Sequence, residues 1–288
     1  MDAIEHVLAI RNDLGECPLW HPSEKKLYWV DIEKHTIYLL DPVSGDLIYH
    51  NVGLPVGSFA FRSKGGMILA TRDGFAFWQP GDNDLFFLGD PEPGKPGARF
   101  NDGAVDRAGR FWAGTMTEDD DSSSLYRLDR DHTFHQMESG ITISNGMGWS
   151  PDNRVFYFTD TIRKVIYAYD FDLQSGTITN RRKFVESPNE AGVPDGLTVD
   201  SQGFVWSVRC GGGNIVRYDP SGCVERVITL PVSHPTSCIF GGTELNELYI
   251  TTSRMLVPEE HRMQQPLAGD LFRLRIDIRG LPVSEFQD

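Results

Sequence analysis

The chain has 288 residues, of which 40% are hydrophobic and 24% are charged, a composition typical of globular proteins with a sizeable core. Asp and Glu outnumber Lys and Arg by 41 to 27, and the net charge of -14 opposes binding to a phosphate backbone or an anionic membrane. We therefore expect neither nucleic acid nor a membrane as a partner.

The first residues, MDAIEHVLAIRNDLGE, have no basic segment, apolar core or cleavage site of a signal peptide, and no stretch of 18 apolar residues occurs anywhere. The four cysteines are scattered without the CxxC spacing of a zinc ribbon or a redox pair. We expect reduced thiols and a cytoplasmic location.

Short runs of alternating β-branched and aromatic residues follow one another along the chain, separated by Gly, Asp, Asn and Pro, a pattern that predicts strands joined by tight turns. Six of these runs are similar: LYWVD from Leu27, ILATR from Ile68, FWAGT from Phe111, FYFTD from Phe156, VWSVR from Val205 and LYITT from Leu248. Their starts are 41, 43, 45, 49 and 43 residues apart. A period of this length built only from strands is typical of a propeller blade of four strands. The sequence therefore predicts an all-β fold, a six-bladed β-propeller.

Each predicted blade begins with a hairpin. Turn sequences precede several of the runs, at residues 106–109, 150–153 and 200–203, so each run is predicted to be the second strand of its blade. The strand before the turn is then expected to line a central channel. The N-terminal segment IEHVLAI is expected to complete the last blade, which begins at LYITT and LFRLRI. We predict one domain over residues 1–288, closed by its two termini.

One position near the start of each predicted channel strand is equivalent in all six repeats, because it lies 10 or 11 residues before the run. Its occupants are Glu16, Gly57, Asn101, Asn145, Asp195 and Ser237. Any one of them is an ordinary turn or surface residue. The hairpin turns, however, are accounted for further along each repeat, so the equivalence of the six positions needs another explanation.

Two carboxylates and two amides brought to one axis would repel one another or stay unpaired unless a cation satisfied them. Oxygen ligands favour hard ions such as Ca²⁺, Mg²⁺ or Mn²⁺, and Zn²⁺ and Fe²⁺ remain alternatives. Open coordination positions would give the ion a catalytic type of site. No intact P-loop, GxSxG, HExxH or GxGxxG motif points to another chemistry.

Several segments together resemble the family of gluconolactonase, regucalcin (senescence marker protein) and luciferin-regenerating enzyme, and the resemblance spans nearly the whole chain. They are LGECPLW at 14–20, RFNDG at 99–103, ISNGMGWSPD at 143–152, VPDGLTVD at 193–200, TSCIFGG at 236–242 and LYITT at 248–252. The resemblance implies a six-bladed propeller whose members include sugar lactonases.

By the same resemblance, Glu16, Asn145 and Asp195 hold one divalent ion, while Arg99 and Asn101 contact the sugar. A further substrate-binding carboxylate is expected at Asp119, with Glu118 as the rival. The chain departs from the family at position 17, where relatives usually have Gly. The backbone at Cys17 must accommodate a side chain, which bears on metal preference more than on metal binding.

The leading hypothesis is a metal-dependent hydrolase that opens a sugar lactone to its aldonic acid, with Asp195 as the proton-transfer residue. The substrate is expected to be a small lactone, and gluconolactone, xylonolactone, arabinonolactone and galactonolactone stay open. The loops around 117–124 and 254–266 that would distinguish them carry no readable code. Two alternatives are a non-catalytic calcium- or sugar-binding propeller and an organophosphate-hydrolysing one. A monomer or weak homo-oligomer is expected.

Overall fold

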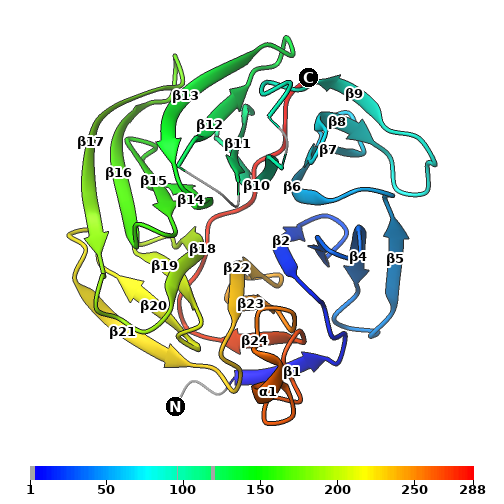
Figure 1. Ribbon diagram of the computed structural model, residues 1–288, viewed down its shortest axis with the longest axis vertical. Coiled ribbons are helices and arrows are strands. Elements are labelled where there is room, and N and C mark those ends of the chain that lie inside the picture. Colours follow the sequence, from blue (N-terminus) through cyan, green and yellow to red (C-terminus); the bar gives the residue numbers. More distant parts are fainter. Residues whose placement is uncertain (1–3, 96, 118–120) are drawn as a thin grey trace.

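A computed structural model describes residues 4–95, 97–117 and 121–288. Within these residues the strands pair into six antiparallel sheets of four strands, which are arranged as blades around a central axis (Figure 1). This arrangement confirms the prediction of an all-β, six-bladed propeller. No helix in the described part of the chain has the length and apolar character needed to cross a membrane.

The first three blades follow one another in the chain. Blade 1 is β2 (Gly15–His21), β3 (Lys26–Asp31), β4 (Thr36–Leu40) and β5 (Leu47–Asn51). Blade 2 is β6 (Val56–Phe61), β7 (Met67–Thr71), β8 (Gly74–Trp78) and β9 (Phe86–Gly89). Blade 3 is β10 (Arg99–Val105), β11 (Phe111–Met116), β12 (Ser123–Leu128) and β13 (Phe134–Ile141).

The remaining blades complete the ring. Blade 4 is β14 (Ser144–Trp149), β15 (Val155–Asp160), β16 (Val165–Asp172) and β17 (Thr177–Glu186). Blade 5 is β18 (Val193–Val199), β19 (Val205–Cys210), β20 (Asn214–Tyr218) and β21 (Val224–Thr229). Blade 6 is β22 (Pro235–Gly241), β23 (Glu247–Thr252), β24 (Leu271–Arg275) and β1 (Ile4–Leu8), with the short helix α1 (Glu259–Arg262) between β23 and β24.

The six similar runs form the second strand of each blade, as predicted, and they are buried on both faces because each sheet packs between two neighbouring sheets. Their large side chains, such as Trp29, Trp112 and Trp206, are fully buried. The hydrophobic clusters join adjacent blades, as where Ile68 of β7 packs in one cluster with Phe111 of β11. The core therefore lies between the blades and leaves the axis to the innermost strands.

The ring is closed by the N-terminal strand, as predicted. β1 pairs antiparallel with β24, with Ile4 opposite Leu274, and thereby becomes the outer strand of blade 6. An ion pair of 2.7 Å between Glu5 and Arg273 joins the same two strands. The N-terminal strand thereby supplies the fourth strand of the sheet that β22, β23 and β24 begin.

The predicted hairpin turns also form. The amide of Gly109 donates to the carbonyl of Asp106 at 2.9 Å, and the amide of Gly203 donates to that of Asp200 at 3.0 Å. Both glycines have positive φ, 81° and 84°, which a side chain would disfavour. These turns place the innermost strands β2, β6, β10, β14, β18 and β22 next to one another around the axis (Figure 1).

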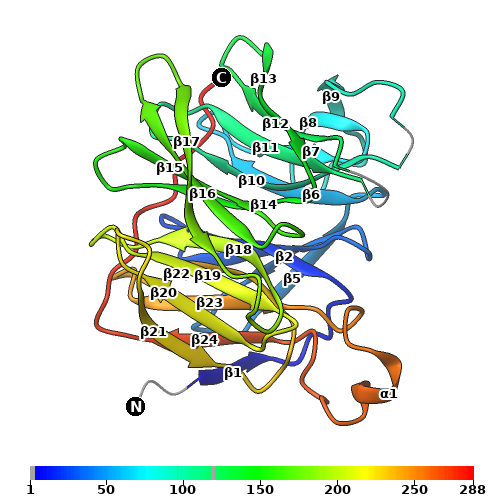
Figure 2. The same ribbon diagram turned by 60° about the vertical axis from the view of Figure 1, so that its left-hand side comes forward.

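The sequence did not predict the path of the last residues, 276–288, which we call the C-terminal strap. The strap leaves β24, crosses the centre of the ring and ends between blades 2 and 3 (Figure 1). It runs on the opposite face of the ring from α1 (Figure 2). Phe286 is fully buried near the end of the strap, where its amide donates to the carbonyl of Phe61 at 2.8 Å. The strap therefore covers the mouth of the channel on the side of the hairpin turns.

Candidate functional site

The six equivalent positions lie where the innermost strands depart from regular pairing. In β2 the register shifts between Glu16 and Leu19, and in β14 it shifts between Asn145 and Met147. Corresponding irregularities occur in β6, β10, β18 and β22. A β-bulge turns a side chain out of the alternating pattern, so these irregularities direct polar groups toward the axis.

Glu16, Asn145 and Asp195 come from three different blades, and each is at most 6% exposed. Burial, and then the charge of Asp195, raise the pKa of Glu16 well above its usual range. The pKa of Asp195 is raised by burial and then by the charge of Asp102, although a hydrogen bond from the side chain of Asn145 opposes the shift. The structure therefore brings the three predicted metal ligands into one electrostatic group.

This donor set fits a divalent cation. Oδ1 of Asp195 is buried and has no hydrogen-bond partner among the described residues, which is unfavourable for a carboxylate oxygen. Carboxylate and amide oxygens are also the ligands of hard ions. No group of three His, Cys, Asp or Glu side chains in the described ranges is placed to hold an ion by itself, so the amide oxygen of Asn145 is needed to complete a set of three.

Arg99 and Asn101, the predicted sugar contacts, lie beside this group on β10. A guanidinium N–H of Arg99 donates to Oδ1 of Asn101 at 2.8 Å, and the amide of the Asn101 side chain donates to the carbonyl of Ser144 at 2.8 Å. The positive charge of Arg99 partly opposes the rise in the pKa of Glu16 that burial and Asp195 cause. The guanidinium thus lies within electrostatic reach of the Glu16 carboxylate.

Arg99 also lines a cavity of about 410 Å³ between blades 2 and 3, together with Arg72, Asp73, Glu92, Lys95 and Thr115. The other predicted substrate contact, Asp119, and its rival Glu118 lie outside the described residues. Their roles remain predictions from the sequence.

Cys17, at the position where relatives are expected to have Gly, has a backbone conformation that favours glycine. Its φ is 47°, in the left-handed region that a residue with a Cβ rarely adopts. The thiol is buried and donates to the carbonyl of Phe59 at 3.6 Å, which ties β2 to β6. As expected, the backbone directly beside Glu16 accommodates the side chain of Cys17, and it does so with a positive φ.

Sequence reasoning missed two residues near the ligands. The first is Cys210 of β19, whose side chain hydrogen-bonds Asp195 and whose own pKa is raised well above its usual range by burial. The second is Asp102, which is 7% exposed and whose pKa burial raises to about 7. Asp102 follows Asn101 in the AsnAspGly segment. The signal that could have found it is that it is a carboxylate directly beside one of the six ring positions.

The comparisons with known proteins agree with the fold. Residues 14–254 match the model of the SMP-30/gluconolactonase/LRE-like region. The chain is 39% identical to the pentonolactonase XacC of Haloferax volcanii over 279 residues, which cover 93% of each chain.

Two solved structures superpose closely on the chain. A luciferin-regenerating enzyme has a TM-score of 0.94 at 24% identity, over 100% of both chains. A calcium-binding protein, regucalcin, from Agrobacterium tumefaciens has a TM-score of 0.94 at 25% identity, over 99% of this chain and 97% of that one. The chain therefore belongs to the SMP-30/gluconolactonase/LRE-like family of six-bladed propellers, which includes sugar lactonases.

Proposed function

We propose that the protein is a metal-dependent lactonase that hydrolyses a small sugar lactone to its aldonic acid. The observation that carries the proposal is the buried pair of carboxylates, Glu16 and Asp195, beside Arg99 and Asn101 at one mouth of the channel. The family and the pentonolactonase relative support the same reaction class.

Glu16, Asn145 and Asp195 would hold the ion, since they offer three oxygen ligands from three blades. A divalent ion bound there supplies Lewis acidity, which polarises the lactone carbonyl and stabilises the developing oxyanion. The sequence and the oxygen donors favour Ca²⁺, Mg²⁺ or Mn²⁺, with Zn²⁺ and Fe²⁺ as alternatives.

The chain's own residues position the reactants and move the proton. Oδ1 of Asp195 has no hydrogen-bond partner within the described part of the protein, and it is proposed to accept the proton of the attacking water. Arg99 and Asn101 orient the lactone through its hydroxyls, with Asp119 as a proposed further contact. The water oxygen bonds to the carbonyl carbon, the bond to the ring oxygen breaks, and that oxygen leaves as a hydroxyl by taking up the proton. The product acid then releases a proton to solvent.

Asp195→Asn tests this assignment with little change of shape. We expect turnover to fall by at least about 100-fold, because a positioned proton acceptor contributes roughly that factor. Asp170→Asn is the control, since Asp170 is an exposed carboxylate on β16. Proton release is measured on a panel of gluconolactone, xylonolactone, arabinonolactone and galactonolactone with defined metals. Near-normal turnover by Asp195→Asn would overturn the role of Asp195.

A non-catalytic calcium-binding propeller is the second candidate, because the Agrobacterium tumefaciens relative is described as a calcium-binding protein. Calcium binding without turnover of any lactone on the panel would favour it. Turnover of a phosphoester in place of the lactones would instead favour organophosphate hydrolysis. A cytoplasmic location, one domain over residues 1–288 and a monomer or weak homo-oligomer complete the proposal, and the four free cysteines support the location.

A further inference from the structure

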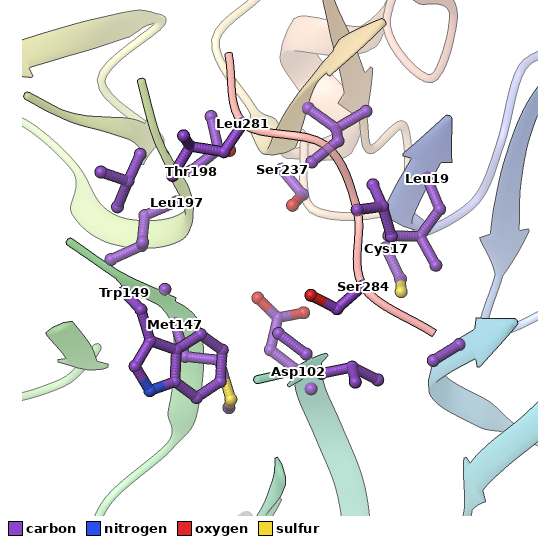
Figure 3. Close-up of a pocket in the computed structure, with 18 of the residues that line it drawn as sticks. Cys17, Leu19, Asp102, Met147, Trp149, Leu197, Thr198, Ser237, Leu281 and Ser284 are labelled. Atoms are coloured by element: carbon purple, nitrogen blue, oxygen red, sulfur yellow. The ribbon is translucent and has the colours of Figure 1, made fainter. Parts of the chain in front are cut away.

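A chamber of about 140 Å³ lies inside the ring, and the C-terminal strap passes along one side of it (Figure 3). Its wall is formed by residues that follow the ring positions in their strands, such as Cys17 after Glu16 and Leu197 after Asp195. The strap contributes residues 281–284. The chamber is therefore a space distinct from the mouth that holds Arg99, and the proposed lactonase reaction does not use it.

One buried carboxylate, Asp102, faces this chamber (Figure 3). Asp102 is 7% exposed and makes no hydrogen bond or ion pair with any described residue. Arg99, whose positive charge acts on it, donates hydrogen bonds to Asn101 and to the carbonyl of Phe100. A buried carboxylate without a hydrogen-bond donor is unfavourable, so a donor bound in the chamber would stabilise Asp102.

The rest of the wall combines apolar side chains with the polar groups of Ser150, Asn153, Thr198 and Ser237, and with Arg107, which contacts the strap. Met147, Trp149, Leu197 and Leu19 surround the space, and the hydroxyl of Ser284 projects toward it (Figure 3). A hard metal ion is a poor match, since it prefers six or more oxygen ligands. A molecule with one positive charge and an apolar body matches both features of the wall. A cavity of roughly 150 Å³ accommodates a molecule the size of benzene.

We propose that this chamber binds a small alkylammonium ion, with the ammonium group paired to Asp102 and the alkyl group packed against Trp149 and Met147. The ammonium donates hydrogen bonds to the carboxylate, and burial of the pair strengthens them. The alkyl group leaves water for an apolar wall. The site is a second binding site and holds whether or not the lactonase proposal is correct.

The strap provides a route of access. It is anchored before the chamber, where the amide of Gly280 donates to the carbonyl of Leu245 at 2.8 Å, and again at Phe286. Between these anchors the backbone of 281–285 makes no hydrogen bond to any other described residue. A contact of 3.4 Å from Arg107 to the hydroxyl of Ser284 is weak. Apart from the packing of Leu281 against the cluster that contains Leu197, the span is held by its two anchors, so it can move aside without breaking a blade.

The test uses isobutylammonium chloride and the protein saturated with the divalent ion that stabilises it most. Binding is followed by NMR through the indole N–H of Trp149, which lines the chamber and has no hydrogen-bond partner in the described structure. We expect this resonance, assigned with Trp149→Phe, to shift on titration. The indole of Trp29, which hydrogen-bonds Asn12 within blade 1, is expected to stay in place.

Two comparisons isolate the charge. Isobutanol has the same shape without the charge, and we expect it to bind at least about tenfold more weakly, since a buried charged hydrogen bond is worth more than that factor. Asp102→Asn is expected to weaken isobutylammonium binding by at least about tenfold and isobutanol binding much less. Equal affinity for amine and alcohol, undiminished binding by Asp102→Asn, or an unmoved Trp149 resonance would each overturn the proposal.

Ser284→Phe gives an independent arm if Asp102→Asn does not fold. Its ring would fill the chamber from the strap without altering a blade (Figure 3). We expect the Trp149 shift with isobutylammonium to be lost in this variant. A full shift would show that the amine binds outside the chamber and would refute the site.

Discussion

If Glu16, Asn145 and Asp195 bind a divalent ion, that ion should raise the Tm of the protein whether or not the protein is an enzyme. A ligand that binds only the folded state at 100 times its Kd stabilises the protein by about 2.7 kcal/mol. The unfolding entropy is about 2.1 cal/mol/K per residue, or about 0.6 kcal/mol/K for 288 residues. The divalent ion is therefore expected to raise Tm by about 4 to 5 °C.

Asp195→Asn should abolish this rise, because it removes one of the two carboxylates among the three proposed ligands while keeping the shape of the side chain. Ser237→Ala is the matched control, since Ser237 occupies the corresponding ring position on β22 and is not a predicted ligand. Tm is measured by calorimetry after chelation, then with Ca²⁺, Mg²⁺, Mn²⁺, Zn²⁺ or Fe²⁺. Circular dichroism checks that each variant is folded.

Three results would refute the reasoning. The first is a wild-type protein whose Tm rises with none of the ions. The second is an Asp195→Asn variant whose Tm rises as much as that of the wild type. A rise lost equally in Ser237→Ala would also contradict it, because the loss would then not depend on the proposed ligands.

Three substitutions test the frame around the site. Phe286→Ala should destabilise the protein by about 3 to 5 kcal/mol in a urea titration, because Phe286 is fully buried and anchors the strap; a cost under about 1 kcal/mol would contradict this anchoring. Asp200→Ala should cost about 3 to 5 kcal/mol, since it removes the buried carboxylate that accepts from Arg217 at 2.7 Å and from the indole of Trp206 at 2.9 Å, and an unchanged midpoint would refute that role. Cys17→Gly should change the unfolding free energy by less than about 1 kcal/mol, because relief of the left-handed backbone offsets the lost thiol contacts; a larger loss would show that φ is not strained.

The blades were predictable because their determinants are local. Alternating residues such as those of LYWVD form a strand whose two faces are both covered, and turns such as Asp106 to Gly109 close a hairpin within a few residues. Six repeats of one period then imply a ring, and β1 completes the last blade as expected. Counting positions within that repeat gave the six ring positions, and the resemblance to the family singled out Glu16, Asn145 and Asp195 among them.

The sequence by itself thus determined the strands, the turns, the six-fold repeat and the ring of polar positions, since each depends on short-range pattern. Only the tertiary structure decided that Asp102 faces a chamber, that Cys210 hydrogen-bonds Asp195, and that the strap crosses the channel. These features depend on contacts between residues far apart in the chain, where no local period applies. The packing of six blades around one axis, and the β-bulges of the innermost strands, decide which side chains meet there.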